Sequence, residues 1–190
     1  MELEKKIIKK LAGAEKIVFL GIGEDKLRDD GVGPYIITQL IENNSDNVKF
    51  INGRTTPEER ISEIQEFSPS HIVLIDTCTL NKPAGTVAIL EKEDMYKYVP
   101  ISSHTIPIPI FINILEEKLK SVIVFMIGIV PKSIDLSDPL VPYKENEIAL
   151  DDYDEDPNLP YFEFKLTEEV QNAADSVVNM IKMILENLKI

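Results

Sequence analysis

Two adjacent carboxylates, Asp29 and Asp30, lie in a glycine-rich turn that follows the apolar run at residues 16–20. Residues 21–34 read Gly-Ile-Gly-Glu-Asp-Lys-Leu-Arg-Asp-Asp-Gly-Val-Gly-Pro, and a helix-like segment follows them. Open α/β sheets bind their ligands at the carboxyl ends of buried strands. The position of these acids therefore predicts an enzyme active site or a metal site at such an end.

Two more side chains could join this site. Asp76 follows the apolar run 72–75, and in a parallel sheet the ends of the first and third strands can be neighbours, which would bring Asp76 toward Asp30. Taken alone, Asp76 is more simply explained as a turn residue. His104 lies in a loop before a helix, whereas the other histidine, His71, is expected to be a partly exposed edge residue. Two carboxylates and one imidazole would suit a divalent metal such as Ni, Zn, Mn or Co.

Nucleotide binding is disfavoured, although Gly21 and Gly23 resemble the start of a dinucleotide-binding fingerprint. Lys26 occupies the position where the third glycine of that fingerprint is required. The acidic side chains of the turn would also oppose a pyrophosphate, which needs backbone donors without nearby negative charge.

Nucleophilic catalysis has weaker candidates. Cys78 lies two residues after Asp76, and His104 could activate it. A small buried thiol is the more common role for an isolated cysteine. Ser102 and Ser103 precede His104, but the chain contains no G-x-S-x-G motif.

The pattern of apolar residues predicts the elements that must position these side chains. Strands alternate with helices in the first half of the chain, which is typical of a parallel α/β sheet. The connection at 77–84 is too short for a parallel crossover, so the strand at 85–90 is expected to be antiparallel and at or near a sheet edge. We expect strands at 16–22, 48–52, 72–76, 85–90 and 122–129, and helices at 3–12, 34–43, 57–67, 109–119 and 168–187.

Length and composition limit the possible functions. A chain of 190 residues with 44% hydrophobic residues fits one domain spanning residues 1–190. A net charge of −13 disfavours a nucleic-acid surface, and the longest apolar run, at 122–130, is too short to span a membrane. The single cysteine suits a reducing cytoplasm. Residues 137–161 are expected to form an acidic surface loop, and 167–190 to contain the C-terminal helix.

The motifs of this chain resemble those of the hydrogenase maturation proteases. These peptidases trim the C-terminal tail of the large subunit of [NiFe] hydrogenases. Within the family, the chain looks nearest to the branch that serves formate-hydrogenlyase-type and energy-converting hydrogenases. The likeness is carried, in order, by residues 21–33, 52–58, 69–78, 83–86, 102–107 and 128–131.

The resemblance has specific implications for the fold and the site. It implies a three-layer α/β/α sandwich with about five strands in a twisted, mostly parallel sheet with one antiparallel strand. The family's metal-binding residues match Asp30, Asp76 and His104. Their metal is nickel already inserted in the hydrogenase large-subunit precursor, although other divalent metals could bind in vitro. The metal, or water polarised by it, would promote hydrolysis, whereas Asp29 would support the turn. Family members usually act as monomers.

Two departures from the family pattern leave other functions open. Glu24 stands where the family usually has Asn, and it either alters the charge of the site or faces solvent. The segment near 139–161 is longer and more acidic than is usual, and it is expected to be either a solvated loop or a contact for a basic substrate. The alternatives are a non-proteolytic accessory protein that binds the nickel-loaded precursor, and a metallohydrolase that carries its own zinc.

Overall fold

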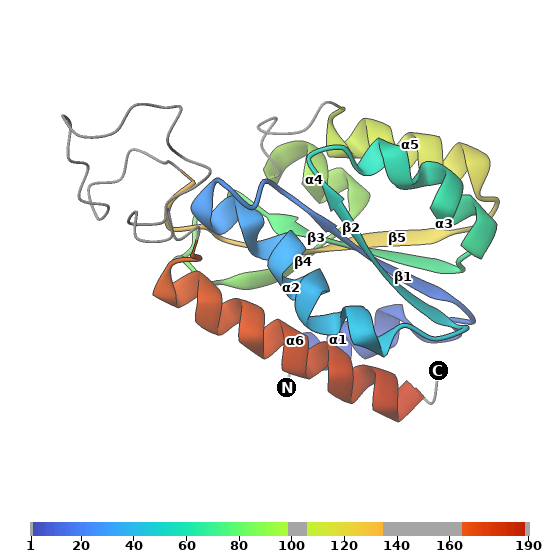
Figure 1. Cartoon of the computed structure of the whole chain (residues 1–190), viewed down its shortest axis with the longest axis horizontal. Helices are drawn as coiled ribbons and strands as arrows, with labels where there is room; N and C mark the ends of the chain where they lie inside the picture. The colour runs from blue at the N-terminus through green and yellow to red at the C-terminus, as the bar shows by residue number, and fades with distance from the viewer. Residues whose placement is uncertain (1, 99–105, 135–164, 189–190) are drawn as a thin grey trace, which may run out of the picture.

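A computed structural model describes residues 2–98, 106–134 and 165–188 of the chain, and its elements pack around one five-stranded sheet (Figure 1). The strand order is β2-β1-β3-β5-β4. The strands are β1 (Ile17–Ile22), β2 (Val48–Arg54), β3 (His71–Thr77), β4 (Val87–Leu90) and β5 (Ile123–Ile129).

Four of the strands are parallel, and β4 is the exception. The strand β3 is at the centre, where it pairs in parallel with β1 on one side and with β5 on the other. At the edge of the sheet, β4 pairs with β5 in the antiparallel direction. The expected antiparallel edge strand is confirmed, and the carboxyl ends of β1 and β3 are neighbours as predicted.

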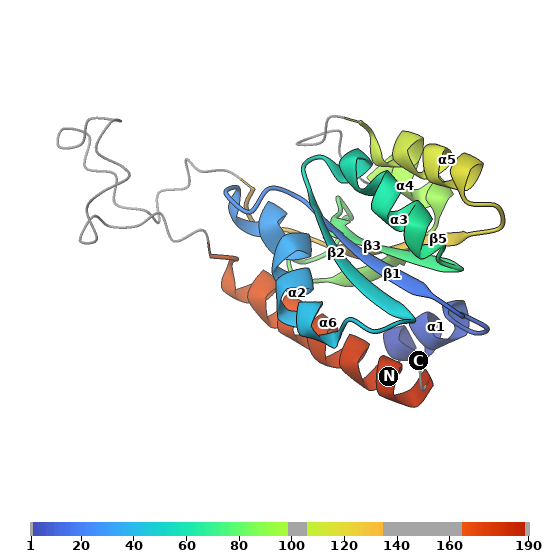
Figure 2. The same ribbon diagram turned by 45° about the vertical axis from the view of Figure 1, so that its right-hand side comes forward.

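Helices cover both faces of the sheet, which makes three layers (Figures 1 and 2). One face is covered by α1 (Glu2–Lys10), α2 (Val32–Leu40) and α6 (Glu168–Leu188). The other face is covered by α3 (Ile61–Phe67), α4 (Lys92–Tyr98) and α5 (Ile108–Lys118). Short 3-10 turns, η1 (Arg28–Gly31), η2 (Ile41–Asn43) and η3 (Pro57–Arg60), adjoin α2 and α3.

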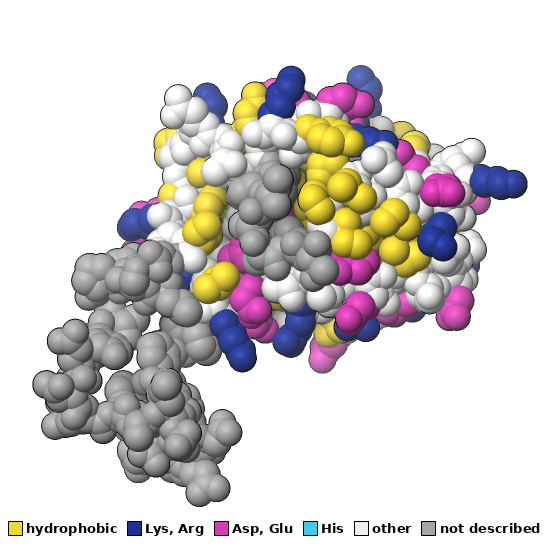
Figure 3. Space-filling model, turned by 90° about the horizontal axis from the view of Figure 1, so that it is seen from above, with side chains coloured by type: hydrophobic (Ala, Val, Ile, Leu, Met, Phe, Trp, Pro, Cys, Tyr) yellow, Lys and Arg dark blue, Asp and Glu magenta, His cyan; other side chains and the backbone are white. Residues whose placement is uncertain are grey.

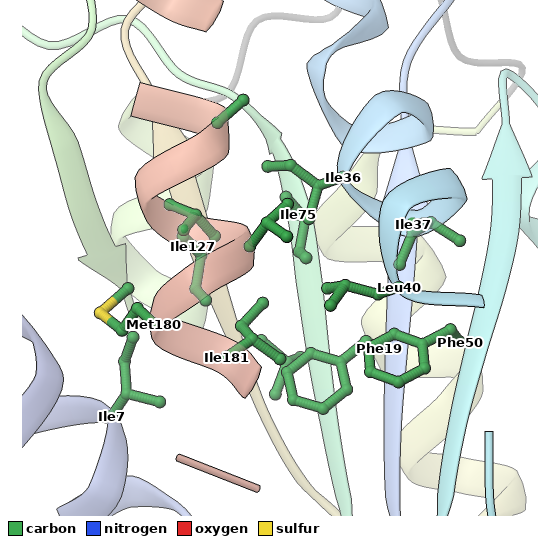
Figure 4. Packing of buried hydrophobic residues seen from close by; sticks show 14 of the residues in the cluster. Ile7, Phe19, Ile36, Ile37, Leu40, Phe50, Ile75, Ile127, Met180 and Ile181 are labelled. Atoms are coloured by element: carbon green, nitrogen blue, oxygen red, sulfur yellow. The ribbon is translucent and has the colours of Figure 1, made fainter. Parts of the chain in front are cut away.

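The alternation of side chains along β3 supplies both hydrophobic cores. Val73 and Ile75 pack into the core under α2 and α6, whereas Ile72 and Leu74 pack into the core under α3–α5. Figure 4 shows the first of these cores, with α2 and α6 side chains lying on the strands. Because β3 is buried on both faces, its sequence is continuously apolar rather than alternating.

Most helices and strands predicted from the sequence are confirmed. One helix and the exposure of one side chain differ from the predictions. The helix α4 was not predicted, because its sequence, Lys-Glu-Asp-Met-Tyr-Lys-Tyr, buries only Met95. The prediction for His71 was wrong: its side chain is 3% exposed. His71 alternates to the same face of the sheet as Val73 and Ile75, which α1, α2 and α6 cover. The predicted acidic loop at 137–161 lies outside the described residues. In the part of the chain that the structure describes, no helix has the length and hydropathy of a membrane span.

The surface over α4 and α5 exposes several large apolar side chains. Tyr96 of α4 is 61% exposed and Ile110 of α5 is 48% exposed. Seen from this side, hydrophobic side chains gather toward the middle of the face and charged side chains lie mainly around it (Figure 3).

Candidate active site

Asp30 and Asp76 meet at the carboxyl edge of the sheet. Asp30 belongs to the η1 turn after β1 and is 2% exposed, while Asp76 lies near the end of β3 and is 1% exposed. The backbone N–H of Glu24 donates to Asp30 Oδ2 at 2.8 Å, and the backbone N–H of Thr77 donates to Asp76 Oδ1 at 2.6 Å. Buried carboxylates require such donors, since burial removes their hydration.

The Thr77 hydroxyl lies between these two carboxylates. Its Oγ1 is 3.4 Å from Asp30 Oδ1 and also 3.4 Å from Asp76 Oδ1. One hydroxyl proton shared between two acceptors makes long, weak hydrogen bonds, so Thr77 marks the point where the two carboxylates converge. Sequence reasoning did not single out Thr77, although its position directly after Asp76 at a strand end was a usable signal.

Gly23 allows the backbone to bring the two acids together. Its φ is +129°, and a Cβ at this position would lie 1.9 Å from the carbonyl oxygen of Asp30 and 3.7 Å from Asp76 Oδ1. Only glycine fits this conformation and this space. Gly33 has a similar role in α2, because a Cβ there would lie within 2.4 Å of the carbonyl oxygens of Ile22 and Ile75.

Asp29 is fully buried and has different neighbours from Asp30. Its Oδ2 accepts hydrogen bonds from the backbone N–H groups of Lys132 and Ser133, both at 2.9 Å. Thr167 donates its backbone N–H to Oδ1 at 2.6 Å and its hydroxyl to Oδ2 at 3.0 Å. The expectation that Asp29 supports the turn and binds neighbouring donors therefore fits the structure.

Glu24, which stands where the resemblance implies Asn, turns toward its own loop. Its Oε1 accepts a hydrogen bond from the backbone N–H of Lys26 at 3.1 Å. The side chain is partly exposed, and only its backbone N–H reaches Asp30. The substitution therefore leaves the donor to Asp30 in place.

The structure argues against a nucleophilic role for Cys78. The thiol is fully buried, and its burial, together with the charge of Asp76, raises the pKa of Cys78 to about 12. The reactive form of a cysteine is the thiolate, which is then scarce at neutral pH. Cys78 acts in packing, in agreement with its simpler interpretation from the sequence.

The third predicted ligand, His104, lies outside the described residues. Within the ranges that the structure does describe, no three His, Cys, Asp or Glu side chains are grouped so that they could hold a metal ion. The carboxylates of Asp30 and Asp76 are hard oxygen donors for a divalent cation, and they need further ligands to complete a site.

Comparison with known proteins identifies the family. Residues 34–148, more than half of the chain, match the sequence model of the hydrogenase maturation proteases. The chain belongs to this family. The matched range contains Asp76 and His104 and begins after Asp30. The protein is thus a protease of [NiFe] hydrogenase maturation, and proteases of this family act on a hydrogenase large-subunit precursor.

Individual relatives support this membership. The chain is 27% identical, over 99% of both chains, to a Methanocaldococcus jannaschii protein that is named for this family. It is 26% identical to the Escherichia coli hydrogenase 3 maturation protease, over 67% of this chain and 81% of the relative. The fold resembles the crystal structure of the [NiFe] hydrogenase maturation protease HycI from Thermococcus kodakarensis, with a TM-score of 0.73 at 21% identity over 95% and 99% of the two chains.

A groove of about 710 Å³ adjoins the turn that carries Asp30 in this protease. Arg28 and Arg54 line it together with Asp25, whose Oδ2 is 3.6 Å from Arg54 Nη1. Gly31, the residue after Asp30, also lines the groove. The groove therefore borders the η1 turn, although Asp30, Asp76 and Thr77 are not among its lining residues.

Proposed function

We propose that this protease removes the C-terminal tail of a [NiFe] hydrogenase large-subunit precursor after nickel insertion. It recognises the substrate-borne nickel through Asp30, Asp76 and His104. The observation that carries the proposal is the convergence of two buried carboxylates on one hydroxyl group, at the carboxyl ends of adjacent parallel strands.

The chemistry of the two carboxylates supports metal recognition. Asp30 and Asp76 are almost fully buried, and two neighbouring negative charges with little hydration repel each other. A divalent cation from the substrate would offset this repulsion, and carboxylate oxygens with an imidazole suit borderline metals such as nickel. Once bound, the nickel would supply Lewis acidity near the scissile peptide, while a carboxylate oxygen could accept a proton from the attacking water.

The limited ligand set explains why the nickel would come with the substrate. A site with two carboxylates and one imidazole has few of the nitrogen and sulfur ligands that hold zinc tightly. The precursor would complete the coordination, so that tight recognition requires nickel and the precursor together, whereas Ni²⁺ alone would bind the site only weakly. In this proposal the protease works in the cytoplasm as a monomer, and the tail segment of the precursor lies in the groove beside Gly31 and Arg54.

The decisive experiment incubates the protease with nickel-loaded and with nickel-free precursor and follows tail removal by intact mass. Asp30→Asn removes the charge of a proposed ligand, and Asp46→Asn makes the same change at an exposed position in the loop before β2. We expect cleavage of the loaded precursor by the wild type and by Asp46→Asn, and none by Asp30→Asn.

Each other outcome contradicts a specific part of the proposal. Cleavage of both precursors would mean that nickel does not control the reaction. Binding of the loaded precursor without cleavage would indicate an accessory protein, in conflict with the family's activity. Zinc retained through purification at one equivalent, and required for cleavage, would indicate a resident metal.

A further inference from the structure

Three segments that are distant in the sequence meet at the side chain of Asp29. The η1 turn holds Asp29 itself, Lys132 and Ser133 follow β5, and Thr167 directly precedes α6. Four donors from the last two segments reach the same carboxylate at 2.6–3.0 Å. The backbone N–H of Asp29 also donates to the carbonyl oxygen of Ser133 at 3.2 Å, which makes the connection to that segment reciprocal.

Asp29 and Asp30 are neighbours in one 3-10 turn, yet their side chains reach opposite partners. Successive side chains in a 3-10 turn diverge by about a third of a full rotation. Asp29 therefore reaches the segments at 132–133 and 167, whereas Asp30 reaches the backbone N–H of Glu24 and the hydroxyl of Thr77. The hydrogen bonds of the two side chains therefore fix the backbone between Asp29 and Asp30 from two directions.

We infer that Asp29 is a positioning residue that fixes the orientation of the Asp30 carboxylate in the metal-recognition site. The inference rests on the proposed function only for the role of Asp30, because the hydrogen bonds of Asp29 are independent of it. If the Asp29 carboxylate loses its partners, the η1 turn can rotate, and Asp30 Oδ2 moves away from the N–H of Glu24. When a group that orients a metal ligand is changed, the metal affinity or the activity of the site typically falls by about 10- to 100-fold.

Asparagine is a sharp test of this role because it keeps the shape of the aspartate. All four donors to Asp29 are N–H or O–H groups, so both side-chain oxygens must accept. If the amide oxygen of an asparagine takes the place of Oδ2, its NH₂ group faces the backbone N–H of Thr167. Two donors then oppose each other, and the connection to the start of α6 is lost.

The first measurement is amide hydrogen exchange, which does not depend on metal or substrate. In Asp29→Asn we expect the backbone N–H of Glu24 to exchange about tenfold faster, because its acceptor on Asp30 has moved. Amides of β1 and β3 serve as the internal reference, and Asp46→Asn serves as the matched variant. Unchanged exchange at Glu24, with faster exchange confined to Lys132, Ser133 and Thr167, would overturn the inference, whatever the metal site proves to be.

The second measurement separates positioning from general stability. Ni²⁺ alone is titrated into wild type, Asp29→Asn, Asp30→Asn and Asp46→Asn, and precursor cleavage is measured well below the unfolding temperature. We expect Asp29→Asn to weaken Ni²⁺ binding and to lower kcat/KM for the nickel-loaded precursor by about 10-fold or more. A lower unfolding temperature with unchanged Ni²⁺ affinity and kcat/KM would show that Asp29 is merely structural. Unchanged Ni²⁺ binding in Asp30→Asn would instead contradict the proposed function.

Discussion

The central strand β3 carries a buried titratable side chain near each end, His71 at the amino end and Asp76 at the carboxyl end. Asp76 accepts a hydrogen bond at 2.6 Å from the backbone N–H of Thr77 and shares the hydroxyl of that residue with Asp30. At the other end, His71 Nδ1 lies 2.9 Å from Ser70 Oγ, but Nε2 has no hydrogen-bond partner among the described residues.

The difference between the two ends lies in what surrounds the buried group. At the carboxyl end, the turn after β1 supplies a backbone donor beside the carboxylates, and α2 begins against the strand ends through Gly33. Helix starts and turns of this kind favour negative charge. At the amino end, burial lowers the pKa of His71, so this imidazole is held in its neutral form. Burial alone therefore does not indicate a site, whereas burial with converging donors does.

The largest effect is expected from Asp76→Asn at the carboxyl end of β3, and His71→Asn makes the matching substitution at the amino end. Asp76→Asn keeps the shape of the side chain but removes a charge that would bind the nickel, so precursor cleavage should fall by about 1,000-fold or more. His71→Asn should leave cleavage within about twofold, because nothing places this residue near the substrate. The measurement is tail removal from nickel-loaded precursor, followed by intact mass.

Loss of cleavage in His71→Asn with an unchanged unfolding temperature would contradict the conclusion that the amino end of β3 has no role in cleavage. Normal cleavage by Asp76→Asn would remove Asp76 from the site. Circular dichroism of both variants checks that the fold is retained.

The five strands, the antiparallel direction of β4 and the meeting of Asp30 with Asp76 could be predicted from the sequence, because buried parallel strands are short apolar runs and their carboxyl ends share one edge. The hydrogen-bond partners of Asp29 could not be predicted from the sequence. Lys132, Ser133 and the backbone of Thr167 donate through N–H groups that every non-proline residue has, and they lie more than 100 residues away along the chain. The burial of His71 was missed because it depends on the helices that cover its face of the sheet, which the local sequence around β3 does not indicate.

The next largest effect is expected at Gly23, which brings the carboxylates at the carboxyl end together. Gly23→Ala would place Cβ 1.9 Å from the carbonyl oxygen of Asp30 at a φ of +129°. We expect the free energy of unfolding to fall by about 3 kcal/mol and cleavage to fall with it, since the η1 turn must shift.

Gly13→Ala is the matched control for this change. Gly13 also has a positive φ, +81°, but a Cβ there would meet no atom within 4 Å. Its substitution should cost only about 1 kcal/mol and leave cleavage unaffected. Urea unfolding of both variants measures the difference, and equal losses would show that the contact with Asp30 is unimportant.

A smaller effect is expected from protonation of His71 at the amino end. Because burial lowers its pKa in the folded state, the unfolded chain binds this proton more readily. Stability should therefore fall as pH decreases below the unfolded value of about 6.5, with a slope of at most about 1.4 kcal/mol per pH unit. The free energy of unfolding of wild type minus that of His71→Asn, measured between pH 5 and 8, isolates this contribution. A difference that is constant over the range would show that His71 has a similar pKa in both states.

The smallest effect is expected at Cys78, which lies one residue beyond β3, beside the carboxylates but not among them. Its thiol is buried and its pKa is raised to about 12, so it stays protonated and cannot act as the nucleophile at neutral pH. Cys78→Ala should lower the free energy of unfolding by about 1 kcal/mol through lost packing and leave the rate of cleavage within about twofold. A well-folded Cys78→Ala protein without cleavage activity would instead make the thiol the attacking group. The function of the carboxyl end of β3 would then no longer rest on its carboxylates alone.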